Sequence, residues 1–242
     1  MEKIDNVLLI GSSGQIGSNI KNNLKKISKK TYCPLRKDFN LENLKSIDKF
    51  LNKIKPKLVI NAAAYTKVDD AEKNKKICYK INALAPKKIA QWCYKNNAFL
   101  VYYSTDYIFS GKNNNNSWKE NDKPKPINFY GKSKLEGEKF ITFSKCNYLI
   151  LRVSWLYADK GENFPKKIIK KTKMEIANNS TKSQEIVKNN ITMNFSVICN
   201  IGYNVAKLIL KIFDICKNPH FVHTYRLFEN KLADQSAALV LS

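Results

Sequence analysis

The chain reads GSSGQIG from Gly11 to Gly17, with three glycines spaced three residues apart. It follows the short apolar run NVLLI (6–10) and opens a segment (16–27) whose apolar residues recur at helical spacing. A G-x-x-G-x-x-G turn between a strand and a helix is typical of a dinucleotide-binding unit, although an ordinary glycine-rich turn is the alternative. Gly11 would permit the tight turn, Gly14 would let the backbone approach a pyrophosphate, and Gly17 would let helix and strand pack closely.

Strand-like and helix-like segments alternate on both sides of this turn. The pattern predicts strands at 6–10, 31–35, 58–63, 99–103 and 148–153, and helices at 16–27, 44–54, 77–94 and 130–143. Such alternation predicts a Rossmann-like α/β fold, a doubly wound parallel sheet covered on both faces. The pattern weakens further on, so we expect a Rossmann-like domain at 1–158 and a reduced or divergent substrate-binding region at 159–242, forming a small, incomplete C-terminal lobe.

Length and composition narrow the class of protein. The 242 residues, 43% of them hydrophobic, are enough for one large α/β domain with a buried core. No apolar run reaches the roughly 18 residues of a membrane span, and Glu2 and Asp5 lie where a signal peptide would be apolar. The cysteines are scattered without a C-x-x-C pair, which argues against a metal site. We expect a cytoplasmic protein with no metal and no membrane partner.

The net charge of +23 raises the question of nucleic-acid binding. Only three of the 43 basic residues are arginines, at positions 36, 152 and 226, and no predicted helix concentrates the charge. Nucleic-acid readout favours arginine for its planar fork. We therefore expect no specific nucleic-acid partner, and a general positive field that attracts anionic ligands such as nucleotides.

A tyrosine and a lysine four residues apart carry the strongest catalytic signal. Tyr130 and Lys134 form Y-x-x-x-K in a predicted helix, and Thr105 ends an earlier predicted strand. Residues i and i+4 share a helix face, so the Lys134 ammonium would approach the Tyr130 ring and lower the pKa of the phenol. Tyr130 would donate a proton to a carbonyl as hydride arrives, and Thr105 would hydrogen-bond the developing alkoxide. Taken alone, the same pattern also occurs on solvated helix faces.

The region after the second predicted strand bears on cofactor choice. An acid there would bind the ribose 2′-hydroxyl of NAD, whereas arginine or lysine suits the 2′-phosphate of NADP. The sequence offers Arg36 and Lys37 and no evident acid. We therefore expect NADP(H), with NAD(H) as the alternative, and a solvated loop as the other interpretation of Arg36. The run NAAAYT (61–66) ends another strand with small residues, which would let a cofactor lie against the backbone.

Together these motifs resemble the extended short-chain dehydrogenases, and within them the dTDP-4-dehydrorhamnose reductase family. The similar stretches are GSSGQIG (11–17), NAAAYTKVDDAE (61–72), INALAP (81–86), YSTDYIFSG (103–111), NFYGKSKLEGE (128–138) and LRVSWLY (151–157). The resemblance implies an NADPH- or NADH-dependent oxidoreductase. It would reduce the 4-keto group of dTDP-4-dehydro-L-rhamnose to dTDP-L-rhamnose, in nucleotide-sugar and cell-surface polysaccharide biosynthesis.

The resemblance also implies roles for particular residues. The catalytic set would be Thr105, Tyr130 and Lys134, and the substrate-binding residues would be Thr105, Asp106 and Trp155. The residues implied to bind the cofactor are Gly11, Gly14, Gln15, Ile16, Gly17, Asp38, Phe39, Ala63, Ala64, Tyr65, Tyr103, Tyr130 and Lys134.

Departures from the family concern the second half of the chain. Family members carry a D-Q-x-G-x-P-T-like stretch where this chain reads EIVKNNITMNFSVICNIGY (185–203), and they extend further. We therefore expect ordinary dinucleotide binding but weak binding and slow turnover of a dTDP-sugar. Two alternatives stay open: another nucleotide-sugar reductase or epimerase, and a catalytically weak NADP-binding regulatory subunit of the same fold. The expected partners are a dTDP-sugar and, as an open alternative, a second copy of the chain in a homodimer.

Overall fold

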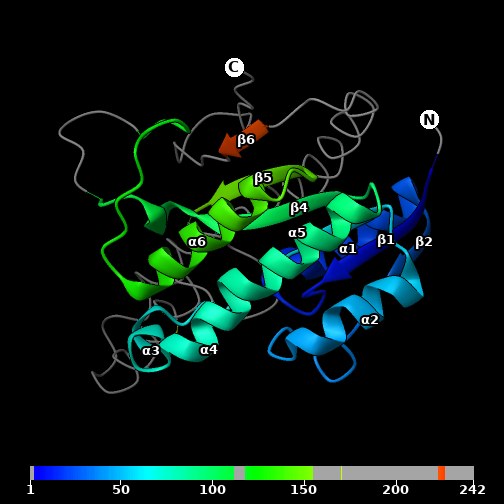
Figure 1. The fold of residues 1–242 in the computed structure, drawn as a ribbon, viewed down its shortest axis with the longest axis horizontal. Helices are drawn as coiled ribbons and strands as arrows, with labels where there is room; N and C mark the ends of the chain where they lie inside the picture. Colours follow the sequence, from blue (N-terminus) through cyan, green and yellow to red (C-terminus); the bar gives the residue numbers. More distant parts are fainter. Residues whose placement is uncertain (1–2, 112–117, 155–169, 171–222, 227–242) are drawn as a thin grey trace, which may run out of the picture.

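The structure, a computed structural model, describes residues 3–111, 118–154, 170 and 223–226 of the chain. Its parallel strands form one sheet in the order β2-β1-β3-β4-β5-β6 (Figure 1). The strands are β1 (Ile4–Ile10), β2 (Ser28–Tyr32), β3 (Leu58–Asn61), β4 (Phe99–Thr105), β5 (Asn147–Val153) and β6 (His223–Arg226). This order, with helices between successive strands from β1 to β5, confirms the doubly wound, Rossmann-like α/β fold that the sequence predicts.

Helices connect the strands and cover the sheet. They are α1 (Gln15–Ile27), α2 (Leu44–Ile54), α3 (Val68–Lys73), α4 (Lys75–Tyr79), the π-helix η1 (Lys80–Leu84), α5 (Ala85–Lys95), the 3-10 helix η2 (Asp106–Ile108) and α6 (Phe129–Phe143). Alternating strand residues face opposite sides, so each central strand must be apolar on both. β4 shows this most clearly, because all of its residues are buried.

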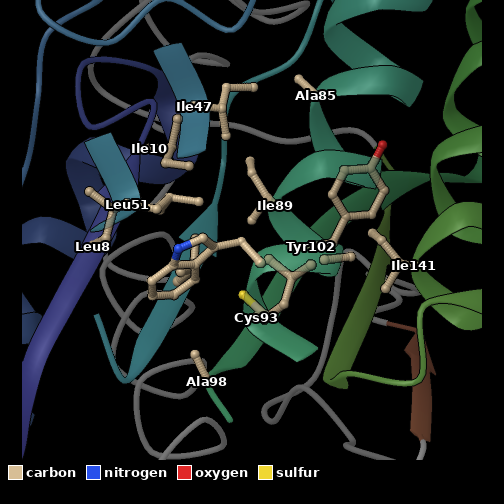
Figure 2. Close-up of a cluster of buried hydrophobic side chains, with 14 of the residues drawn as sticks. Leu8, Ile10, Ile47, Leu51, Ala85, Ile89, Cys93, Ala98, Tyr102 and Ile141 are labelled. Carbon is tan, nitrogen blue, oxygen red and sulfur yellow. The ribbon is translucent and has the colours of Figure 1, made fainter. Parts of the chain in front are cut away.

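Two apolar clusters hold these layers together. On one face, α2, α5 and α6 pack through Ile47, Ile89 and Ile141 onto strand residues such as Leu8 (Figure 2). On the other face, α1 packs through residues such as Leu24 onto alternate residues of β1, β3, β4 and β5. Burying one such large apolar side chain contributes roughly 1.5–3 kcal/mol, so the two clusters are the main stabilising element of the fold.

The second strand differs in position from the prediction. We predict it at 31–35, whereas β2 spans Ser28–Tyr32 and pairs with β1 from Ser28, opposite Ile4. β2 is an edge strand, so Lys29 and Lys30 remain exposed there without cost to the core. Pro34 has no N–H to donate to a ladder, which explains why the strand does not continue.

The segment predicted as one helix at 77–94 is interrupted in the structure. Between α4 and α5 the chain forms η1, in which the Ala85 N–H bonds back to the Lys80 carbonyl. Pro86 lies in the first turn of α5, where its missing N–H costs nothing. The short helix α3 was not predicted.

The boundary proposed at residue 158 remains a prediction. β6 pairs with β5, so a strand from the segment assigned to the substrate-binding region extends the sheet. The stretch at 185–203 and Trp155 lie outside the described residues. Within the part of the chain that the structure describes, no helix is long and apolar enough to cross a membrane.

Candidate active site

The glycine-rich turn lies where the strand order reverses. β1 lies between β2 and β3, and the chain leaves it in opposite directions on its two sides. A ligand crevice is therefore expected at the carboxyl ends of β1 and β3. Gly11 follows β1 with φ +82°, a left-handed conformation that favours glycine. A Cβ on Gly11 would lie 2.7 Å from the Ala63 nitrogen and 2.8 Å from the Ala62 carbonyl carbon. The turn after β1 therefore packs backbone to backbone on the segment after β3.

The N-terminus of α1 fits a pyrophosphate. Gly14 caps this helix without a side chain, and the first turn has no acidic residue. The N–H groups and positive dipole end of such a helix favour an anion. A Cβ on Gly14 would meet just one atom within 4 Å, Gly11 O at 3.4 Å, so this side of the turn has room for a ligand. Gln15 and Ile16, both half-buried, form the first turn. The residues present thus fit the dinucleotide that the sequence predicts.

We expect Gly17→Ala and Gly14→Ala to separate packing from ligand binding. A Cβ on Gly17 would lie 2.1 Å from Gly11 O, so the alanine must push α1 off the turn, at a cost of about 1–3 kcal/mol or more. Gly14 has φ −75°, which alanine adopts freely, so its variant should keep the melting temperature but lose dinucleotide affinity. Thermal unfolding and dinucleotide titration of both variants provide the check. An unchanged melting temperature for Gly17→Ala would contradict its packing role.

The segment after β2 forms the next part of this edge. The Leu35 carbonyl accepts the N–H groups of Asp38 and Phe39, each at 3.0 Å, and so closes a turn. Phe39 is buried and stacks on Phe50 of α2, with 4.4 Å between ring centroids, while Asp38 is exposed. Their predicted contacts with the cofactor remain predictions.

Arg36 lies in this turn and is not alone there. Its guanidinium Nη2 forms an ion pair with Glu42 Oε1, although 75% of the arginine side chain is exposed. Glu42 lies beyond Asp38 in the sequence and had no predicted role, because it follows β2 at a greater distance than the usual acid.

The carboxyl end of β4 carries a hydrogen-bonded polar group. The Thr105 hydroxyl donates to Asp106 Oδ1 at 3.1 Å and accepts the Tyr107 N–H at 3.2 Å. Asp106 Oδ2 accepts the Ser154 hydroxyl at 2.7 Å. Thr105 is buried, and these contacts fix its hydroxyl and the Asp106 carboxylate next to each other. Ser154 had no predicted role.

Tyr130 lies in the first turn of α6, close to this group. The Asn128 side chain caps the helix by accepting the Gly131 N–H at 2.7 Å, so the helix begins where Tyr130 faces β4. Burial raises the pKa of Tyr130 to about 12, although a hydrogen bond with Thr105 lowers it and Asp106 raises it further. The expected lowering of this pKa is therefore wrong, because desolvation of the phenolate dominates. The phenol stays protonated at neutral pH, which is the form of a proton donor.

Lys134 lies one turn further along α6 and is almost fully buried. Its ammonium donates to the Tyr103 carbonyl at 2.5 Å and lies 4.0 Å from the centroid of the Tyr102 ring. Burial lowers the pKa of Lys134 to about 7, while the Glu138 carboxylate raises it. The lysine thus titrates near neutral pH, where a nearby ligand group can shift its protonation.

We expect dinucleotide binding to take up a proton at Lys134. Ribose hydroxyl oxygens beside the ammonium would stabilise its charged form and raise its pKa above about 7. At a pH slightly above 7, Lys134 would be only partly protonated in the free protein and almost fully protonated in the complex. Calorimetric titration in buffers of different ionisation enthalpy measures this uptake. Uptake that is zero at pH 8, or unchanged in Lys134→Met, would contradict the assignment.

The amide of Asn82, in η1, ties two parts of the site together. Its Oδ1 accepts the Tyr65 N–H at 2.8 Å, and its Nδ2 donates to the Tyr65 carbonyl at 3.0 Å. The same Nδ2 donates to the Ser133 hydroxyl on α6 at 3.0 Å. Asn82 therefore fixes the segment Ala63–Tyr65, predicted to line the cofactor, against the helix that carries Tyr130.

A buried ion pair anchors the other end of α6. Arg152 on β5 donates through Nε and Nη2 to the Glu138 carboxylate, at 3.1 Å and 2.7 Å, and both side chains are almost fully buried. Arg152 Nη1 also donates to the Glu120 carbonyl at 2.8 Å. The guanidinium lies 5.5 Å from the centroid of the Phe109 ring, which stacks on Trp118. One arginine thus joins α6, β5 and the segment around residue 120.

Comparison with known proteins agrees with this geometry. The family model for the RmlD substrate binding domain matches residues 5–184. The chain belongs to the RmlD family. This RmlD chain is 36% identical over 171 residues to dTDP-4-dehydrorhamnose reductase of Salmonella typhimurium, covering 69% of this chain and 57% of that protein. It is 33% identical over 172 residues to the spore coat polysaccharide biosynthesis protein SpsK of Bacillus subtilis, covering 70% and 60%. It therefore spans less than two thirds of these relatives' lengths.

Solved structures resemble the RmlD chain in the same way. A dTDP-4-dehydrorhamnose reductase from Clostridium acetobutylicum superposes with a TM-score of 0.72 at 30% identity, over 91% of this chain and 73% of that one. A Bacillus anthracis dTDP-4-dehydrorhamnose reductase in complex with NADP gives 0.67 at 36% identity, over 72% and 61%. The family resemblance stated from the sequence motifs is confirmed.

Several of the predicted site residues of this RmlD chain lie together at one edge of the sheet. The structure brings Thr105, Asp106 and Tyr130 together, with Lys134 one helical turn away. The glycine-rich turn contacts Ala63 at the neighbouring strand ends, while the Tyr103 side chain lies in the cluster under α1. The individual roles of these residues remain predictions.

Proposed function

We propose that this protein is an NADP(H)-dependent oxidoreductase that reduces the 4-keto group of dTDP-4-dehydro-L-rhamnose to dTDP-L-rhamnose. One observation carries the proposal: a buried, protonated Tyr130 lies beside Thr105 and one helical turn from a buried Lys134. These residues lie at the same edge of the sheet as the glycine-rich turn. The names of the similar proteins from Salmonella typhimurium and Bacillus anthracis support the same substrate class. Such an activity belongs to nucleotide-sugar and cell-surface polysaccharide biosynthesis in the cytoplasm.

The geometry supports a simple division of labour. Bound NADPH would supply a hydride to the keto carbon. The Tyr130 hydroxyl would donate its proton to the carbonyl oxygen, a step worth typically 10²–10⁴-fold for a positioned acid. The Thr105 hydroxyl would hydrogen-bond the same oxygen as charge develops on it. Lys134 would bind the ribose and, when charged, offset the burial that raises the pKa of the phenol.

Asp106 and Trp155 are proposed to face the sugar. Asp106 is held by Thr105 and Ser154, so its carboxylate is oriented before any sugar hydroxyl binds. A dTDP-sugar is the proposed partner. A homodimer is the proposed assembly, and sedimentation would test it.

NADPH consumption with a panel of 4-keto nucleotide sugars tests the proposal. We expect slow oxidation of NADPH with dTDP-4-dehydro-L-rhamnose and formation of dTDP-L-rhamnose. Turnover of a different 4-keto sugar alone would redirect the proposal to another nucleotide-sugar reductase. Binding of NADPH with no turnover of any sugar would favour a catalytically weak, cofactor-binding subunit.

We further expect NADPH to bind more tightly than NADH. Arg36 and Lys37 lie at the exposed tip of the turn after β2, where the adenosine ribose lies in this fold class. A guanidinium matches the charge and geometry of a 2′-phosphate, which NADH lacks. Parallel calorimetric titrations of the two dinucleotides measure the difference. Equal or reversed affinities would remove Arg36 from phosphate recognition.

A further inference from the structure

The ion pair between Arg36 and Glu42 lies beside the proposed adenosine site. Arg36 belongs to the turn closed by the Leu35 carbonyl, directly after the edge strand next to β1. Cys33, at the start of this segment, packs at the rim of the same cluster as Ile16, in the first turn of α1. The pair is thus on the segment that borders the nucleotide turn, at the carboxyl edge of the sheet.

The two partners differ in how firmly they are held. The Arg36 side chain is 75% exposed and the Glu42 side chain 30%. Glu42 is also anchored through its backbone, because its N–H donates to Asn40 Oδ1 at 3.0 Å. Buried Phe39 and Leu41 hold the chain on either side of Asn40. Glu42 is therefore the fixed partner, and the arginine is the side chain that can turn toward a ligand.

A carboxylate paired with Arg36 alters what the arginine offers a cofactor. A 2′-phosphate carries about −1.5 to −2 charges at pH 7, and Glu42 already takes an Nη2 donor of the guanidinium that would bind it. The phosphate must therefore displace the carboxylate or bind close to it, against charge repulsion. The ribose 2′-hydroxyl of NADH is neutral, so neither cost applies to it. The pair is largely exposed, so its opposition is moderate rather than prohibitive.

We propose that Glu42 sets the cofactor preference by competing with the 2′-phosphate for Arg36, and so narrows the difference in affinity between NADPH and NADH. This inference rests on the proposed dinucleotide function. Glu42 acts through Arg36, and it is a specificity-determining residue without contact to the reacting atoms.

Dissociation constants of NADPH and NADH for the full chain and its variants test the proposal. We expect Glu42→Gln to tighten NADPH about 3- to 5-fold and to leave NADH within about twofold, the size that an exposed charge pair allows. In an Arg36→Ala background, Glu42→Gln should alter the NADPH constant by less than about twofold. Asp5→Asn is the matched control, since it removes the carboxylate of Asp5 on β1 from an exposed ion pair with Lys29 on β2.

The possible outcomes are distinct. A change in the NADPH-to-NADH ratio with Glu42→Gln but not with Asp5→Asn supports the proposal. An equal loss for both dinucleotides would show a structural role near the start of α2 and overturn it. An undiminished Glu42→Gln effect in the Arg36→Ala background would overturn the competition for Arg36. Failure of the unaltered chain to bind either dinucleotide would overturn the proposed function itself.

Discussion

Replacing Tyr130 with phenylalanine is expected to reduce turnover by about 10² or more and to leave dinucleotide affinity nearly unchanged. The hydroxyl is the proton donor in the proposed reaction, and burial keeps it protonated by raising its pKa to about 12. The ring itself is 9% exposed and packs edge-on against Tyr107, contacts that phenylalanine retains. The variant thus removes the phenolic hydroxyl, which carries the donated proton, and little packing.

The measurement is the steady-state rate of NADPH oxidation with the 4-keto sugar, together with calorimetric titration of NADPH. Tyr94→Phe, on the exposed side of α5, provides the matched loss of a phenol away from the site. Lys134→Met should lower both turnover and dinucleotide affinity, because the ammonium serves the phenol and the ribose. Near-normal turnover of Tyr130→Phe would assign the acid to another residue.

The second large effect is expected on stability. Arg152→Met should lower the free energy of unfolding by about 3–5 kcal/mol, because it leaves the Glu138 carboxylate buried without its partner. Methionine keeps much of the arginine's apolar length, so lost charge pairing and hydrogen bonds account for most of the change. Urea unfolding of the variant and the unaltered chain measures it.

Two controls sharpen this prediction. Lys139→Met breaks the exposed pair between Lys139 and Glu136 and should cost no more than about 1 kcal/mol. Adding Glu138→Gln to Arg152→Met removes the unpaired charge and should recover part of the loss. A loss below about 1 kcal/mol for Arg152→Met would mean that water reaches Glu138 and that the pair is not an anchor.

Where the signal is local, the sequence predicts the structure closely. The strand, glycine-rich turn and helix around Gly11–Gly17 follow from a pattern within a few adjacent residues. The predicted helix at 44–54 coincides with α2, because its apolar residues recur with helical period and no breaker interrupts them. Thr105, Tyr130 and Lys134 were singled out by the Y-x-x-x-K spacing together with the preceding strand, the glycine-rich turn and the family resemblance, and the fold brings them to one edge.

Where the outcome depends on non-local contacts, the sequence falls short. The second strand was predicted too far along the chain, because a lysine-rich edge strand carries no apolar run. Its register is set by pairing with β1. The direction of the Tyr130 pKa shift depends on burial, which spacing does not reveal. Glu42 pairs with Arg36 across a turn, and Glu138 on α6 pairs with Arg152 on β5. The lone arginine in the apolar run NYLILRV (147–153) was the available signal for a buried pair.

The π-helix between α4 and α5 has a consequence for how this segment tolerates change in length. An i→i+5 turn takes up one residue more than an α-helical turn, and each residue rotates a helix by about 100°. Before η1, Cys78 faces α6, with its sulfur 3.2 Å from the Ser133 hydroxyl. After it, Ile89 faces the sheet. The extra residue sets the rotational phase between these two faces, so deleting one residue of Lys80–Leu84 other than Asn82 would turn one of them to solvent although Cys78 and Ile89 both remained.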